Sequence, residues 1–84
     1  MVDLTEAQRA DIRHALGLPN RRDVTTRSHY VCDPDPWWDS LVALGLVRTR
    51  QRTVFGNVYW VGRRLAAQVL EAHEGIDHVI VGDY

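Results

Sequence analysis

The segment from Gly45 to Leu70 constrains the fold most, because it carries three structural signals in direct succession. Gly45 follows an apolar run and is typical of a helix end, since glycine adopts the left-handed conformation without a Cβ penalty. Gly56-Asn57 lies between two β-prone runs, which predicts a β-hairpin with a two-residue turn. Gly62 then opens a segment with apolar residues at helical spacing. The segment therefore predicts a helix, a hairpin and a second helix, in that order.

Length and composition set the broad class of the chain. Its 84 residues predict a single domain, 1–84, with a thin core. The net charge of −1 provides no global positive field that would draw the protein to nucleic acid. A single cysteine excludes an internal disulfide and suits a reducing cytosol. The sequence has no apolar run of membrane-spanning length and no signal-peptide character, so we expect a cytoplasmic protein without membrane contact.

The first helix is expected to begin at Thr5 and to end at Gly17. Thr5 and Gln8 have the spacing of a capping box, in which each side chain satisfies a free backbone N–H of the other residue. The apolar stripe of this helix comprises Ile12, Ala15 and Leu16, with Ala7 or Ala10. The side chains that we expect to lie in water are Arg9, Asp11 and Arg13.

A β-like segment, 24–31, precedes a second helix over 36–44. Asp35 is a good N-cap for this helix, and Pro36 suits its first position. The core candidates on its apolar stripe are Trp37, Leu41 and Leu44. Trp38 has two interpretations: it fills the core, as large aromatic residues do in small domains, or it is an exposed anchor for a partner.

A simple register for the hairpin places its arginines on one face. With Gly56-Asn57 as the turn, Val54 lies opposite Tyr59, and Arg52 lies opposite Val61. Arg48, Arg50 and Arg52 then share a face with Tyr59, and they can bind phosphate or an acidic partner. In the alternative interpretation, this is a solvated strand face whose charges discourage aggregation. A slip of one residue would exchange the two faces.

Two further segments offer contacts with partners. Arg63 and Arg64 fall in the first turn of the last helix, where the macrodipole disfavours cations unless the site is exposed or holds an anion. The run from Ile76 to Val81 predicts a closing strand. That strand can pair with the hairpin or with another subunit, which makes a homodimer a candidate assembly.

Signals for catalysis or metal binding are weak. His29 and Cys32 have a ligand-like spacing, and His73 and His78 could complete a set of four, but these pairs match no standard zinc motif. The sequence has no glycine-rich phosphate loop, no nucleophile elbow and no paired-carboxylate site. We therefore expect a protein that is not an enzyme and that needs no metal or cofactor.

The segment 41–70 resembles the winged-helix pattern, in which an apolar helix ends at Gly-Leu, a wing follows, and a Tyr-x-Val-Thr-x-x-Gly segment opens the last helix. In Y-W-V-G-R-R-L-A, Gly62 stands where the pattern has threonine, and Ala66 where it has glycine. The resemblance implies a winged-helix-like α+β fold of about three helices with a β-hairpin wing and a C-terminal strand. Together with 12–17 and 27–31, the segment also resembles small uncharacterised phage and prophage proteins.

Two functions are consistent with these patterns. In winged-helix regulators the helix before the wing reads duplex DNA with polar and basic side chains, whereas here it offers Asp39, Ser40 and tryptophans. We therefore favour an accessory phage protein that docks on a host protein or protein–nucleic-acid complex, of the type that inhibits CRISPR defence. A DNA-binding regulator is the alternative. The expected contact residues are Trp38, Arg48, Arg50, Arg52, Tyr59, Arg63 and Arg64.

Overall fold

The computed structural model describes residues 2–52 and 56–77. The helices in these residues are α1 (Glu6–Ala15), α2 (Pro36–Ala43) and α3 (Arg63–Val69). The strands are β1 (Val24–Thr25), β2 (His29–Cys32), β3 (Val47–Arg52), β4 (Gly56–Val61) and β5 (Gly75–Ile76). This confirms the predicted α+β class with three helices and a hairpin. The arrangement is compatible with a winged-helix-like order.

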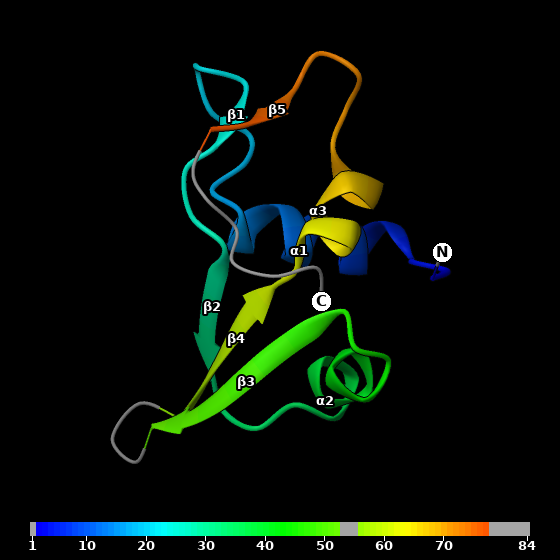
Figure 1. Cartoon of the computed structure of the whole chain (residues 1–84), viewed down its shortest axis with the longest axis vertical. Coiled ribbons are helices and arrows are strands. Elements are labelled where there is room, and N and C mark those ends of the chain that lie inside the picture. The colour runs from blue at the N-terminus through cyan, green and yellow to red at the C-terminus, as the bar shows by residue number, and fades with distance from the viewer. Residues whose placement is uncertain (1, 53–55, 78–84) are drawn as a thin grey trace.

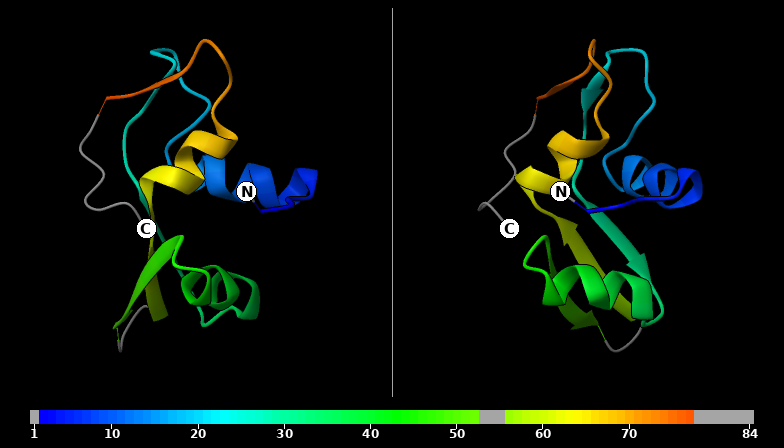
Figure 2. Two further views of the ribbon diagram at one scale, coloured as in Figure 1. Left: turned by 45° about the vertical axis from the view of Figure 1, so that its right-hand side comes forward. Right: turned by 90° about the vertical axis from the view of Figure 1, so that its right-hand side faces the viewer.

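The strands form two separate sheets (Figure 1). An antiparallel sheet has the order β2-β4-β3, and β1 pairs in parallel with β5. Helices α1 and α2 lie on the same side of the three-stranded sheet (Figure 2, left). The predicted closing strand, 76–81, is corrected in part: its first residue, Ile76, lies in β5, which pairs with β1 and not with the hairpin, and Asp77 is not in a strand. The rest of that predicted strand, 78–81, lies outside the described residues.

The predicted helix ends are confirmed, because each is determined by local chemistry. The Gln8 backbone N–H donates to Thr5 Oγ1 at 3.1 Å, and the Thr5 N–H donates to Gln8 Oε1 at 3.0 Å, which completes the capping box. The Asp35 carboxylate caps α2 by accepting from the Trp37 N–H at 2.8 Å. Just after α1 and α2, Gly17 and Gly45 have φ values of 79° and 75°, as expected for glycines that end helices.

The core lies between the helices and the inner face of the three-stranded sheet. Trp38 is at its centre, stacked between Tyr30 and Tyr59 with ring centroids 5.6 Å and 5.5 Å away. Leu41 is buried as predicted, but Leu44 is 60% exposed, so its assignment to the core is wrong. Leu44 is the C-cap residue of α2, beyond the last residue of the helix. The core residues are Ile12, Ala15, Leu16, Leu18, Trp38, Leu41, Val47, Tyr59, Val61, Leu65, Ala66 and Val69.

The hairpin is present, but the predicted turn and register are wrong. Gly56 and Asn57 belong to β4, and Val61 lies opposite Val47, five positions from the expected Arg52. Position 56 requires glycine because of its place in β4 and not because of a turn. Its φ is +88°, and a Cβ there would clash with the Cys32 carbonyl oxygen. Because the shift is by an odd number of residues, the two faces of β4 are exchanged relative to β3.

Candidate functional site

The strongest candidate for a site is the face of the three-stranded sheet that points away from α1 and α2. Strand alternation and pairing arrange its side chains in two rows. One row contains Arg48, Trp60 and His29, and the next contains Arg50, Val58 and Val31. We call these six residues the outer sheet face. They come from β3, β4 and β2, so residues far apart in the sequence form one continuous surface.

The outer sheet face combines positive charge with a partly covered aromatic ring. Arg48, Arg50 and His29 are exposed, and Trp60 is half-buried. Val31 is 40% exposed, which is unusual for a large apolar residue in this protein. Val58 is only 3% exposed, yet it does not belong to the main core cluster. The face is therefore a second, shallower apolar patch bordered by guanidinium groups.

Tyr59 does not accompany these arginines, which corrects the predicted contact set. It points into the core, is 0% exposed, and its hydroxyl donates to Asp39 Oδ1 at 2.8 Å. The same hydroxyl accepts from the Asp35 backbone N–H at 3.3 Å and from Asn57 Nδ2 at 3.2 Å. Tyr59 therefore attaches the start of α2 to the sheet, and no partner can reach it.

Trp38 is also unavailable as an exposed anchor. It is 2% exposed and stacked between two tyrosines, so the core-filling interpretation is correct. The residue that the prediction missed is Trp60, which replaces Tyr59 beside the arginines. The sequence carries no local signal for this, because a glycine in a turn and a glycine at a close backbone approach look alike; the approach of Gly56 to Cys32 within β4 sets the register that turns Trp60 outward.

The remaining predicted arginines lie outside the two rows of the outer sheet face. Arg63 and Arg64 are exposed in the first turn of α3, directly after β4. Arg64 Nη2 donates to the Gly45 carbonyl oxygen at 3.3 Å, which ties the start of α3 to the end of α2. Arg52 is in β3 opposite Gly56, and its side chain lies outside the described part of the chain.

Negative charge gathers at the start of α2, where Asp33, Asp35 and Asp39 lie near Cys32. Burial is the largest effect that raises the pKa of the Cys32 thiol, and the three aspartates raise it further. The thiol is therefore protonated at neutral pH and is a poor nucleophile. His29 points to the opposite face of β2 by strand alternation, so the suggested His–Cys pair does not form.

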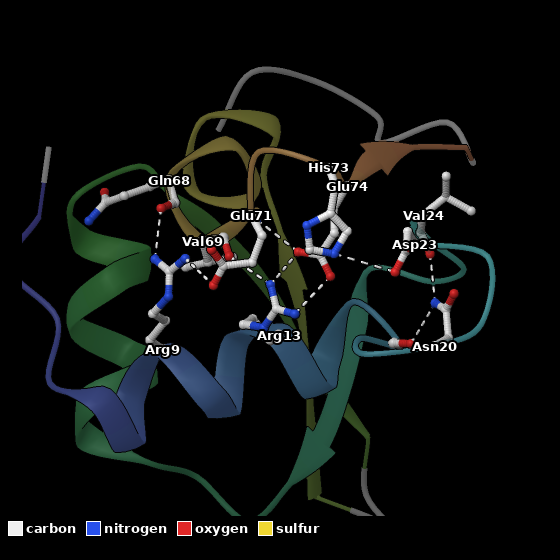
Figure 3. A network of polar contacts seen from close by, with 11 residues as sticks. Arg9, Arg13, Asn20, Asp23, Val24, Gln68, Val69, Glu71, His73 and Glu74 are labelled. Atoms are coloured by element: carbon white, nitrogen blue, oxygen red, sulfur yellow. Dashed lines mark hydrogen bonds and ion pairs between the residues drawn. The ribbon is translucent and has the colours of Figure 1, made fainter.

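A second polar cluster joins α1 to the end of α3, and we call Arg9, Arg13, Glu71 and Glu74 the α1–α3 network (Figure 3). Arg9 Nη1 donates to the Gln68 carbonyl at 3.1 Å, and Arg13 Nη1 donates to the Val69 carbonyl at 3.0 Å. Arg13 also pairs in bidentate fashion with Glu74, with 2.8 Å between Nη2 and Oε2.

The expectation that Arg9 and Arg13 lie in water is therefore wrong. The exposed fractions of the Arg13 and Glu74 side chains are only 15% and 1%. The physical reason lies in α3, which ends at Leu70 in extended conformation without a glycine cap. Its last carbonyl groups need donors, and two arginines one helical turn apart on α1 supply them.

Hydrogen bonds from Arg13 are the main cause that lowers the pKa of Glu74 to about 2, against the opposing effect of burial. The Glu71 backbone N–H donates to Glu74 Oε1 at 2.8 Å and favours the charged form as well. Glu74 is therefore ionised throughout the physiological pH range, and its negative charge is matched by Arg13. These groups have partners within the fold, so we assign the network to stability.

Asp23, His73 and Glu74 offer ligand atoms within 4.8 Å of one another, a separation that a metal ion could bridge. His73 Nε2 lies 3.5 Å from Asp23 Oδ1. Both oxygens of Glu74 already accept from Arg13, whose guanidinium supplies positive charge at this place. A metal ion would have to bind beside that cation, so we assign this cluster to the fold as well.

A pocket of about 330 Å³ is lined by Val2, Leu44, Leu46, Arg64 and Gln68. Gln68 holds the Val2 backbone by hydrogen bonds in both directions. The lining residues include neither a nucleophile nor a general acid–base pair, so this pocket provides no catalytic constellation.

No helix in the described part of the chain is long and apolar enough to cross a membrane. Comparisons with family models, with curated proteins and with solved structures find no match to this chain. The interpretation of the site therefore depends on its geometry and chemistry.

Proposed function

We propose that this chain is a non-catalytic binding protein that docks on a negatively charged macromolecule or complex through the outer sheet face. The observation that carries the proposal is that Arg48 and Arg50 are exposed side by side on β3, next to the half-buried Trp60 of β4. Guanidinium groups bind carboxylates and phosphates in bidentate fashion, and tryptophan and arginine are frequent energetic centres of interfaces.

The separation of charge within the molecule supports this proposal. The net charge is −1, so attraction to a negative partner has to come from a local surface. Asp33, Asp35 and Asp39 are gathered at the start of α2, and the Asp39 carboxylate faces the inner side of the sheet through Tyr59. A negative partner is therefore repelled by the α2 side and attracted by the outer sheet face, which orients binding.

The specific form that we propose is an accessory phage protein that inhibits a host defence complex, of the anti-CRISPR type, in the bacterial cytoplasm. This form rests on the resemblance to small phage and prophage proteins and on the small size of the chain. The outer sheet face adds a defined contact surface to it. Such an inhibitor acts by occupying a surface, which requires no catalytic group.

A regulator that binds duplex DNA is the second candidate, favoured by the arginines on the hairpin. Two observations weigh against it. Helix α2, which would read the bases, has no basic residue and starts beside Asp35. Strands β1 and β2 separate α1 from α2, so α2 has no helix joined to it by a short turn, as in a helix-turn-helix motif.

Affinity capture from a bacterial lysate tests the proposal when it is done with matched variants. The test variant is Arg48→Ala/Arg50→Ala. The control, Arg21→Ala/Arg22→Ala, removes the same charge from two exposed residues in the loop before β1, at the far end of the molecule from the start of β4 (Figure 1). We expect wild type and control to retain the same partner and the test variant to lose it. Capture that is equal for all three proteins would overturn the proposal.

A further inference from the structure

We infer that the outer sheet face binds single-stranded nucleic acid, with one base stacked on Trp60 and the phosphates held by Arg48 and Arg50. This inference rests on the proposed function and names the chemistry of the partner. It covers single-stranded DNA and RNA, because both present the same charged backbone and the same aromatic bases. It does not depend on Asp39, whose carboxylate accepts from the Tyr59 hydroxyl on the inner side of the sheet.

The spacing of the two arginines on β3 suits a nucleic-acid backbone. Alternate residues of a strand are about 6.6 Å apart and point to the same side of a sheet. That distance is comparable to the separation of successive phosphates in an extended single strand. Arg48 and Arg50 are both exposed and lie on an edge strand, so a chain that runs along β3 can contact them in succession.

Trp60 is placed where a base above that backbone would stack. It lies directly opposite Arg48 on the central strand β4, and neighbouring strands are about 4.8 Å apart. The indole is half-buried, so its orientation is restrained while part of its surface stays accessible. An aromatic side chain on a sheet, beside basic residues, is a general platform for unpaired bases.

The rest of the outer sheet face extends the same surface. His29 is exposed on the other side of Trp60, where its ring can contact a base or a phosphate. In the neighbouring row, Val31 is 40% exposed next to Val58 and offers apolar surface to the adjacent base or sugar. The face thus provides positive charge along one edge and, at Trp60, part of one aromatic ring on the central strand.

Single strands fit this arrangement better than duplex DNA or an acidic protein does. The bases of a duplex are stacked on each other and present only their edges in the grooves, so Trp60 could not reach a base face. An acidic polypeptide such as polyglutamate would engage Arg48 and Arg50 but has no aromatic face to stack on the indole. Binding of an unpaired strand that depends on Trp60 therefore separates single strands from a duplex and from a simple acidic chain.

Fluorescence anisotropy with labelled oligonucleotides of about 12 nucleotides tests the inference. The probes are oligothymidylate, oligouridylate and a duplex of the same length, with polyglutamate as competitor. We expect either or both single strands to bind more tightly than the duplex. Trp60→Leu should weaken binding about tenfold or more, because stacking on an aromatic ring is lost, whereas Trp60→Phe should retain most of the affinity.

Salt dependence tests the role of the arginines in the same assay. Each phosphate contact on a single strand contributes about 0.7 to the slope of log K against log salt, so Arg48→Ala/Arg50→Ala should lower that slope by about 1.4. The control Arg21→Ala/Arg22→Ala should leave it unchanged. Circular dichroism of each variant establishes that it is folded.

Three results would overturn the inference: no binding to either single strand, equal binding to the duplex, or affinity that is unaffected in folded Trp60→Leu. If polyglutamate binds in an Arg48- and Arg50-dependent manner while the single strands do not, the inference fails but the proposed function stands. If the Arg48→Ala/Arg50→Ala variant captures the lysate partner as well as wild type does, the proposed function fails as well.

Discussion

The outer sheet face and the α1–α3 network both contain pairs of arginines, but the two pairs have different environments. Arg13 is 15% exposed at its side chain and pairs with Glu74, which is 1% exposed. Arg48 and Arg50 are exposed on a strand at the edge of the sheet. In the first region the guanidinium groups satisfy carbonyl groups and a carboxylate of the fold. In the second they border an aromatic surface.

This difference shows that spacing alone does not reveal what an arginine does. Arg9 and Arg13 are separated by one helical turn, and Arg48 and Arg50 by one strand repeat, so each pair shares a face of its element. The neighbouring element then decides the role: the uncapped end of α3 recruits the first pair, and Trp60 accompanies the second. The network should therefore carry stability, and the outer sheet face should carry binding.

The largest effect on stability is expected for Arg13→Ala. The substitution leaves the buried Glu74 carboxylate without its bidentate partner, which should lower the free energy of unfolding by about 3 to 5 kcal/mol. Urea denaturation at neutral pH measures the change. Arg9→Ala is the matched control: its ion-pair partner Glu71 is more than half exposed, so the main loss is the hydrogen bond to the Gln68 carbonyl, which should cost about 1 kcal/mol. Equal losses for both variants would remove the distinction between them.

The network should also make stability depend on pH. The pKa of Glu74 is about 2 in the folded protein and 4.5 in the unfolded chain, so the unfolded state binds more protons between these values. The contribution of Glu74 is complete above about pH 4.5 and is lost as the pH falls toward 2; it amounts to about 3 kcal/mol. Urea denaturation between pH 2 and 6 should show that the free energy of unfolding of wild type falls as the pH is lowered. If Glu74→Gln showed the same dependence on pH, that result would contradict the prediction.

A smaller loss is expected for Gly56→Ala, which tests the register that turns Trp60 outward. The residue has a φ of +88°, and an added Cβ would meet the Cys32 backbone, so the expected cost is about 2 to 3 kcal/mol. Thermal unfolding measures it. Gly75→Ala is the control, because a Cβ added there would meet only the Val24 side chain, at 3.8 Å. If Gly56 were in a free turn, the alanine variant would lose little more than the control.

The smallest effect on stability is expected for Arg48→Ala/Arg50→Ala. Exposed charges contribute little to folding, so the free energy of unfolding should change by less than about 1 kcal/mol. Calorimetry of the double variant gives the value, and Arg21→Ala/Arg22→Ala gives the background for removing two exposed arginines. A loss as large as that of Arg13→Ala would mean that the outer arginines serve the fold and not a partner.

Local chemistry in the sequence predicts the ends of the helices. Thr5 with Gln8, Asp35 and Gly45 act within a few residues of their own positions, and each acts as expected. The hairpin register was wrong because the role of Gly56 depends on Cys32, which is 24 positions away in the sequence. A glycine required by contact with a distant strand has the same local signature as a glycine in a turn.

The candidate site was therefore predicted in part. Arg48 and Arg50 follow from alternation within β3 alone, and they are exposed. Which aromatic residue lies beside them depends on the pairing between strands. Tyr59 was predicted at this place, whereas the structure has Trp60 there. The α1–α3 network was missed because the end of α3 contacts α1 only in the folded protein, and α1 shows no trace of this contact in its own periodicity.

NMR titration of the labelled protein with oligothymidylate and, separately, with polyglutamate tests the central claim most directly. We predict that at least one of these polyanions shifts the amides of β3 and β4 and the indole N–H of Trp60, while the amides around Arg13 and Glu74 stay unchanged. Shifts centred on α1 and the end of α3, or no shift in β3 and β4 with either polyanion, would contradict the assignment of binding to the outer sheet face.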